Sequence, residues 1–348
     1  MPFVRLDGLG RPARSVRSHR CDRSDRSDRC DRSSRSLTAL AAPALALALL
    51  LGGCASTPPQ LQALERQWPA DLPTQVDLSG RTPFIAQDDY ECGPAALAML
   101  LRTAGKATTV EQLKPQVFLP GRKGSLQTEM LVATRRQGLP AYVLPPRLDA
   151  LLTEVAAGHP VIVFQNLSLD IAPVWHYAVA VGYDKQRRTI LLHSGKTARQ
   201  EVELPVFERT WARGDYWAMT TLPPDLLPAS LDGAGTGAAL AALERLDAPA
   251  ARKGYTAALT RWPGEPVLLL GAGNTAYAAK DRRTAVRHYA RLTDVRPDLP
   301  EGWNNLAQVL LEQGQRYKAS LAIERAVALG GPRLDQYKAL QKKITAGM

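Results

Sequence analysis

A single cysteine stands where the sequence predicts the start of a helix. Cys92 is followed by Gly93 and Pro94, and the apolar residues after them recur at helical spacing up to Gly105. Proline suits the first helical turn, because its missing N–H would have no partner there. The free N–H groups and the dipole at a helix N-terminus favour a thiolate, the nucleophilic form of cysteine. We therefore predict Cys92 as a nucleophile, and the alternative is a buried cysteine that acts as a small apolar side chain.

Two further residues extend this chemistry. Gln87 lies in the loop five residues before Cys92, where its amide and the Cys92 N–H could donate to one oxygen and form an oxyanion hole. His176 opens the run 175–183, whose aromatic, β-branched and small residues predict a strand. We predict that His176 takes the proton of Cys92 and later protonates the leaving amine. A hydrogen-bonded core histidine is the alternative.

These residues resemble the peptidase C39-like group of bacterial cysteine peptidases. The similarity rests on Gln87, on Cys92–Leu97 and on His176–Gly182, and it extends over about residues 80–222. The resemblance implies an α+β, papain-like fold in which Gln87 is the oxyanion residue, Cys92 the nucleophile and His176 the base. We expect no cofactor and no metal, since the sequence has no CxxC pair to hold zinc.

The sequence departs from that group at the third catalytic position. The better-known members place an aspartate after the strand that follows the histidine, whereas here the predicted strand Thr189–Leu192 leads to Ser194. The third residue normally orients the imidazole. We expect Ser194, a backbone carbonyl or water to do so, or the Cys–His dyad to act alone. Asp184 is assigned to a hairpin turn, and Asn166 and Asp170 are weaker candidates.

The N-terminal part is predicted to be a leader segment. Residues 1–36 are an Arg-rich low-complexity segment, which is either an over-extended start or disordered. Residues 37–53 are uncharged and suit a signal peptide, because they are short for a membrane span. They end at Cys54 in a pattern that resembles a bacterial lipobox, which predicts acylation of Cys54 and a lipidated tether over residues 54–80. The alternative is an ordinary secretory signal.

The distribution of charges and cysteines limits the kinds of partner and the kinds of cross-link that we expect. Ten Arg and five Asp fall within residues 1–53, a net charge of +5, so a modest +6 of the total of +11 is spread over the rest of the chain. No basic helix stands out and there is no P-loop, so we expect neither nucleic acid nor ATP as a partner. Once the leader is removed and Cys54 acylated, Cys92 is the last free thiol, which excludes a disulfide framework. The four cysteines are Cys21, Cys30, Cys54 and Cys92.

The C-terminal part repeats itself every 34 residues. Pro266 recurs as Pro300, and further apolar positions keep the same spacing. This period is typical of tetratricopeptide repeats, which stack helix pairs into an all-α solenoid. We predict a linker at 223–231 and two to three repeats at 232–348. Together with the lipobox, these repeats resemble a subgroup of C39-like lipoproteins.

These features indicate three alternative functions. In the first, residues 81–222 form a cysteine peptidase domain that is anchored in the bacterial envelope at the periplasmic face of the outer membrane. It would cleave a periplasmic peptide or protein, while the repeats bind a protein partner or merely cover the domain. The second is a catalytically inactive binding or scaffold lipoprotein. The third is an amide transferase or deamidase that uses the same Cys–His dyad.

Two helices are also predicted between Cys92 and His176. Ser125 is expected to cap a helix that runs to Arg136, and a further helix at Leu148–Ala157 should lead into a strand at Val161–Gln165.

Overall fold

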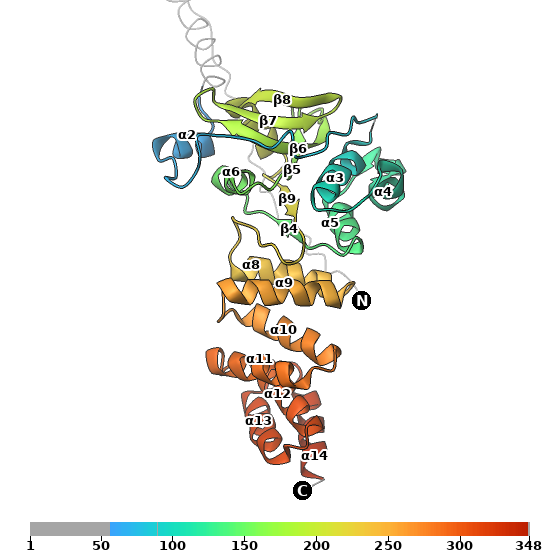
Figure 1. Cartoon of the computed structure of the whole chain (residues 1–348), viewed down its shortest axis with the longest axis vertical. Helices are drawn as coiled ribbons and strands as arrows, with labels where there is room; N and C mark the ends of the chain where they lie inside the picture. Colours follow the sequence, from blue (N-terminus) through green and yellow to red (C-terminus); the bar gives the residue numbers. More distant parts are fainter. Residues whose placement is uncertain (1–55, 89, 347–348) are drawn as a thin grey trace, which may run out of the picture. The chain divides into compact units, whose positions relative to one another are not determined.

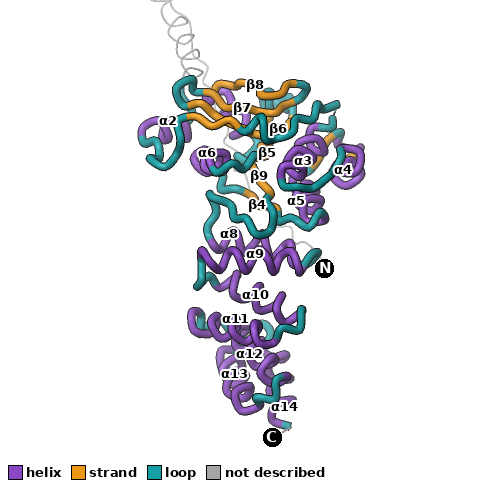
Figure 2. The backbone as a smooth tube through the Cα atoms, viewed as in Figure 1, coloured by secondary structure: helices purple, strands orange, loops and turns teal. Residues whose placement is uncertain are grey.

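A central sheet organises the N-terminal domain. The computed structural model describes residues 56–88 and 90–346, and over these residues it contains a seven-stranded sheet in the order β4-β9-β5-β6-β7-β8, with β1 paired to β6. Every pair in this sheet is antiparallel. The strands are drawn as arrows in Figure 1 and in orange in Figure 2. The strands are β1 (Gln75–Asp77), β4 (Ala141–Val143), β5 (Val161–Asn166), β6 (Trp175–Asp184), β7 (Thr189–Ser194), β8 (Thr197–Glu203) and β9 (Ala218–Thr221).

Helices cover both sides of the sheet. Figure 1 shows α3, α4 and α5 on one side and α2 and α6 on the other. A short hairpin of β2 (Phe118–Leu119) and β3 (Gly124–Ser125), joined by the 3-10 turn η1 (Pro120–Arg122), lies between α4 and α5. The helices are α2 (Pro59–Arg66), α3 (Cys92–Thr103), α4 (Val110–Val117), α5 (Gln127–Arg136), α6 (Leu148–Ala156) and α7 (Leu204–Ala212). The domain thus combines helices with an antiparallel sheet, which confirms the α+β class expected from the sequence.

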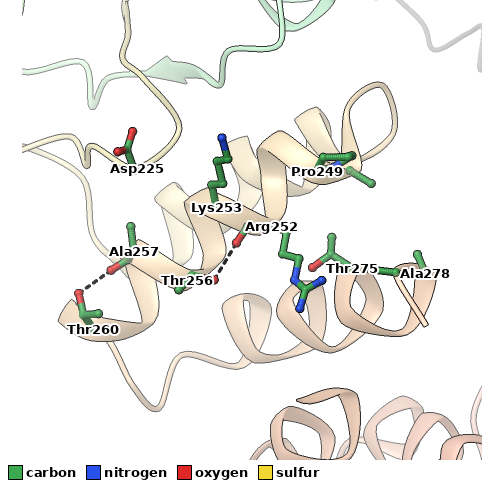
Figure 3. Close-up of a pocket in the computed structure, with 11 residues that line it drawn as sticks. Asp225, Pro249, Arg252, Lys253, Thr256, Ala257, Thr260, Thr275 and Ala278 are labelled. Carbon is green, nitrogen blue, oxygen red and sulfur yellow. Dashed lines mark hydrogen bonds between the residues drawn. The ribbon is translucent and has the colours of Figure 1, made fainter. Parts of the chain in front are cut away.

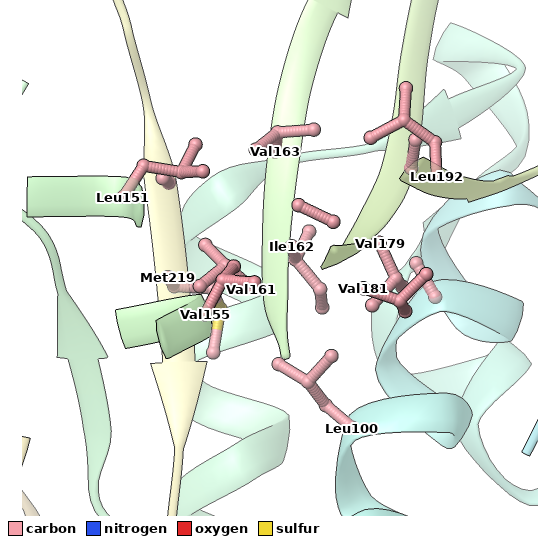
Figure 4. Close-up of a cluster of buried hydrophobic side chains, with 14 of the residues drawn as sticks. Leu100, Leu151, Val155, Val161, Ile162, Val163, Val179, Val181, Leu192 and Met219 are labelled. Atoms are coloured by element: carbon pink, nitrogen blue, oxygen red, sulfur yellow. The ribbon is translucent and has the colours of Figure 1, made fainter. Parts of the chain in front are cut away.

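The core lies between these helices and the central strands. Helix α3 is buried on all sides from Ala95 to Leu101, which matches its almost wholly apolar sequence. Leu100 from α3 and Leu151 from α6 approach the strand residues Ile162 and Val163 (Figure 4). This packing fixes the N-terminus of α3 against the sheet, because interiors this dense tolerate little displacement.

The folded domain begins earlier than the sequence predicted. Helix α2 packs on the domain, and the buried carboxylate of Glu208 on α7 accepts from the N–H groups of Gln60 and Leu61 at its first turn. Strand β1 then pairs with the far end of β6. From Pro59 onward, the segment expected to be a tether is thus part of the fold. Cys54 and the leader lie outside the described residues.

The C-terminal region contains only helices in its described part. They are α8 (Gly233–Glu244), α9 (Ala248–Arg261), α10 (Pro266–Ala278), α11 (Arg282–Val295), α12 (Pro300–Glu312), α13 (Arg316–Leu329) and α14 (Leu334–Thr345). Helices α10, α12 and α14 begin at 266, 300 and 334, and α9, α11 and α13 begin at 248, 282 and 316. Both series advance by 34 residues, so the sequence period reappears as a period of helix starts.

The segment between the two regions is packed rather than free. Glu154 of α6 is fully buried and accepts from both the N–H and the hydroxyl of Ser230, while His159 contacts its other oxygen at 2.7 Å. Burial raises the pKa of Glu154, but the hydrogen bonds from His159 and Ser230 outweigh it, and the net pKa lies below the usual value. Within the described residues no helix has the length and apolarity to cross a membrane.

Candidate active site

The cysteine lies at the predicted position. Cys92 is the first residue of α3, and it is partly exposed, while the following residues Gly93–Leu101 are buried. The backbone N–H of Tyr177 on β6 lies close enough to the sulfur to lower the thiol pKa, as do the amides of Gly93 and of Cys92 itself. The pairing of β6 with β7 ends at Val179 and His193, so the Tyr177 amide lies beyond the last pair. The sulfur therefore occupies the edge of the sheet where β7 stops, one residue along the strand from His176.

The histidine is held by the serine that replaces the expected aspartate. Nε2 of His176 lies 2.9 Å from Oγ of Ser194, at the end of the neighbouring strand β7. Alternate residues of a strand share a face, so His176 and Tyr177 point to opposite faces of β6. One ring nitrogen is thus engaged by Ser194, which leaves Nδ1 for a proton transfer at the strand end. Among the alternatives named from the sequence, the structure favours Ser194 as the residue that orients the ring.

Burial acts on both partners of the predicted dyad. It raises the pKa of the Cys92 thiol, and the nearby amides oppose this rise only in part. Burial also lowers the pKa of His176 below its ordinary value. Each shift disfavours the charged form of its group, the thiolate of Cys92 and the imidazolium of His176.

The predicted oxyanion residue carries a free donor. Gln87 is 5% exposed, yet its Nε2 has no hydrogen-bond partner within the described residues. Its backbone N–H donates to the carbonyl of Gly195, the residue after Ser194, at 3.1 Å. This bond ties the loop before α3 to the same strand end. A buried donor left without a partner costs about 1–3 kcal/mol, which is unusual unless a ligand completes it.

A second unpartnered group was not recognised in the sequence. Ser125 lies in β3, and α5 begins only at Gln127, so the predicted helix cap was wrong. Its hydroxyl is buried without a partner, and a Cβ added to Gly93 would lie 2.3 Å from it. The carbonyl of Ser125 accepts from the Tyr177 hydroxyl at 3.2 Å. The absence of a side chain at Gly93 therefore lets the β2–β3 hairpin lie against the start of α3.

Several other polar residues have structural roles. The ring of His193 is buried and fully used, with Nε2 against the carbonyl of Thr82 and Nδ1 accepting from the N–H of Arg199. Asn166 orders the loop before β6, and Asp170 contacts it at 3.4 Å. Asp184 accepts from a turn amide, which confirms its assignment to the hairpin. The described residues contain no group of three or more side chains suited to hold a metal ion.

Comparisons with known proteins find similarity over a part of the chain. Residues 79–219 match the family described as Peptidase_C39 like family. A C39-like peptidase structure from Bacillus anthracis aligns with a TM-score of 0.36 and 20% identity, over 42% of this chain and 97% of that chain. The peptidase domain of Streptococcus ComA, a bi-functional ABC transporter involved in a quorum sensing pathway, aligns with a TM-score of 0.34 and 15% identity, over 41% and 98%. No curated protein matches the chain.

The family match includes the whole candidate site. Gln87, Cys92, His176 and Ser194 all lie within residues 79–219. The match suggests that this domain is a cysteine peptidase.

Proposed function

We propose that this protein is a cysteine peptidase that cleaves a peptide or protein in the bacterial periplasm. One observation supports this most strongly: Cys92 at the N-terminus of α3 meets β6 beside His176, whose ring is bound by Ser194. An unpartnered donor on Gln87 is anchored to the same strand end. Nucleophile, base, orienting residue and oxyanion donor thus come from four segments that meet at one place.

Proton transfer is proposed to accompany the attack, because burial disfavours the charged forms of Cys92 and His176. His176 removes the thiol proton as the sulfur attacks the substrate carbonyl, so that the S–C bond forms and the carbonyl electron pair moves to oxygen. Gln87 Nε2 and the N–H of Cys92, which the helix does not use, then donate to this oxyanion; one such donor is worth about 3 kcal/mol. The imidazolium returns its proton to the leaving amine as the C–N bond breaks. Water, deprotonated by His176, hydrolyses the acyl-enzyme and restores the thiol.

The decisive experiment compares the protein with its Cys92→Ala variant. Each is incubated with a periplasmic extract, and new peptide termini are identified by mass spectrometry. We expect termini that appear with the unaltered protein and are missing with Cys92→Ala and with His176→Ala. Thr345→Ala, an exposed residue at the end of α14, serves as the matched control. Identical termini with and without Cys92 would rule out the peptidase.

A catalytically inactive binding module is the second candidate, because a serine stands where an aspartate would stabilise an imidazolium. The two candidates differ in whether an acyl-enzyme forms. An active site should carry an acetyl group on Cys92 after reaction with p-nitrophenyl acetate, as measured by intact mass. An unmodified protein under conditions that acetylate free cysteine would favour the binding module.

We also propose that acylation of Cys54 holds the protein at the periplasmic face of the outer membrane. The support is the sequence alone, since small residues and an uncharged run precede Cys54. Helix α2 begins five residues later, so the domain would lie near the lipid surface. Incorporation of an alkyne-bearing fatty acid that disappears in Cys54→Ala would support the anchor. A soluble, unlabelled protein would refute it.

The helical region is proposed to be a tetratricopeptide-repeat array that binds a protein partner. Its 34-residue period of helix starts supports this, as does a groove of about 800 Å3 that Lys253 helps to line and in which Arg252 of α9 lies near Thr275 of α10 (Figure 3). Asp225, from the preceding segment, also lines it. Crosslinks from Lys253 to a partner, absent in Lys253→Glu and kept in Lys338→Glu, would test this proposal.

A further inference from the structure

The connection between β5 and β6 exposes an unusual number of apolar side chains. Over residues 167–175 the exposed large apolar residues are Leu167, Leu169, Ile171, Val174 and Trp175. Leu169 is 67% exposed and Ile171 is 91% exposed, so neither contributes to the core. Single exposed apolar residues are ordinary on protein surfaces, but a group of five within nine residues points to a partner. We call residues 167–175 the apolar loop.

The loop is held in a defined conformation. Asn166, at its base, is fully buried, and its Oδ1 accepts from the N–H groups of Ser168 and Val174 at 3.1 and 2.9 Å. The N–H of Leu167 also donates to the carbonyl of Val174. Arg213 of α7 donates to the Asn166 carbonyl through two nitrogens. The apolar side chains are thus presented by a preorganised loop, which reduces the entropy lost on binding.

A series of contacts connects the loop with the candidate site. The ring of Trp175 stacks on the ring of Phe164 with their centroids 5.0 Å apart, and the centroids of the Phe164 and Tyr177 rings are 4.7 Å apart. The Tyr177 hydroxyl donates to Ser125, which lies against Gly93 beside the nucleophile. In addition, Trp175 directly precedes the base in sequence. Packed side chains therefore connect the loop with the neighbourhood of the nucleophile.

The apolar loop itself contains little charge. Asp170 is the one ionisable residue in the loop, and Asn166 contacts its carboxylate. On the nucleophile's side, the exposed Tyr90 precedes Cys92 by two residues and lies under the ammonium of Lys123 at 5.7 Å. Exposed aromatic residues thus stand just before both the nucleophile and the base. A substrate held here would be recognised by the burial of apolar side chains.

We propose that the apolar loop is the substrate-binding surface of this site and that it selects an extended polypeptide with Leu, Ile, Val or Phe beside the cleaved bond. The proposal rests on the proposed peptidase function. The occupant is a polypeptide because side-chain contacts connect the loop with the site that is proposed to attack a peptide carbonyl. An extended chain directs every second side chain to one surface, so alternate apolar residues would meet the loop together.

Binding is tested separately from cleavage. Full-length Cys92→Ala protein is titrated into a short fluorescein-labelled peptide with Leu and Phe at alternate positions, and into its counterpart with Ser and Asn there. We expect the apolar peptide to bind at least about ten-fold more tightly. Leu169→Asn combined with Ile171→Asn should remove this difference. Leu246→Asn with Leu321→Asn, two similarly exposed residues of the helical region, should preserve it.

Each outcome has one meaning. Equal binding of the two peptides, or a preference that survives the loop substitutions, overturns the proposal whether or not the protein cleaves. Binding of phosphatidylethanolamine–phosphatidylglycerol vesicles that depends on the loop, without peptide binding, would overturn it in favour of a lipid surface. Loop-dependent peptide binding supports the surface even if the unaltered protein leaves the apolar peptide intact; that result would instead defeat the proposed hydrolysis. Circular dichroism of the loop variants verifies that they are folded.

Discussion

Replacement of Ser194 tests how the imidazole is controlled. In the structure its hydroxyl lies 2.9 Å from Nε2 of His176, which is the geometry of a neutral hydrogen bond. Such a bond contributes about 1 kcal/mol, so Ser194→Ala should lower kcat/KM about five-fold. A carboxylate at the same distance would bind the imidazolium with about 1.5–3 kcal/mol. The difference of about 1–2 kcal/mol should raise the pKa of His176 by about one unit in Ser194→Asp.

The sign of this effect can be read from a pH profile. The base acts in its neutral form, so kcat/KM falls as the pH drops through the pKa of His176. Because burial lowers that pKa, the acidic limb of the unaltered protein should lie below the ordinary histidine value of 6.5. In Ser194→Asp this acidic limb of the pH profile should move to higher pH. An imidazolium beside the sulfur should also accelerate alkylation of Cys92 by iodoacetamide at pH 6.

The assay is kcat/KM between pH 5 and 9 on a fluorogenic peptide taken from an identified cleavage site. Thr197→Ala is the matched control, since Thr197 is exposed and pairs with Ser194 across the hairpin. An unchanged rate in Ser194→Ala together with an unmoved limb in Ser194→Asp would refute the orienting role. Alkylation rates give the same comparison without any substrate.

Three further changes have defined outcomes. Gln87→Ala should reduce kcat about 100-fold with little change in KM, because its free donor acts on the oxyanion; equal losses in kcat and binding would contradict this. Gly93→Ala should destabilise the domain by about 1–3 kcal/mol through its contact with Ser125, and adding Ser125→Gly should restore the unfolding midpoint. Glu154→Gln should cost about 1–3 kcal/mol at neutral pH, since Ser230 loses a charged acceptor. The lowered pKa of Glu154 means that this stabilisation is full above 4.5 and disappears as the pH falls through the folded value, so a deficit that persists in acid would be inconsistent with it.

The local features of the site were visible in the sequence. Pro94 and the apolar spacing after it located the start of α3, and the run after His176 located β6, because each signal lies within one element. The role of Ser194 was left open among several alternatives. Its contact with His176 depends on the register of β6 and β7, which shifts at a bulge between Ala180 and Gly182. Such a shift moves side chains relative to one another and leaves no local signature.

The errors came from contacts between distant residues. The segment 59–66 is short and rich in polar side chains, and it was predicted to be part of a tether. Its helix is stabilised by Glu208, which is 147 residues away from Leu61. Short helices depend mainly on tertiary packing, so local propensity could not reveal this one. Ser125 was assigned to a cap for a related reason, since its position against Gly93 arises only when the hairpin folds onto α3.

The state of the dyad links the site to the apolar loop. Burial raises the pKa of Cys92 and lowers that of His176, and the neutral Ser194 offers no charge to reverse either shift. Charge separation is therefore deferred to the attack itself, where it must be offset by oxyanion donors and by binding energy from the substrate. A small ester provides only the first of these. A polypeptide that also covers the exposed side chains of residues 167–175 provides both, so the difference in kcat/KM between the two substrates should shrink when Leu169 and Ile171 are made polar.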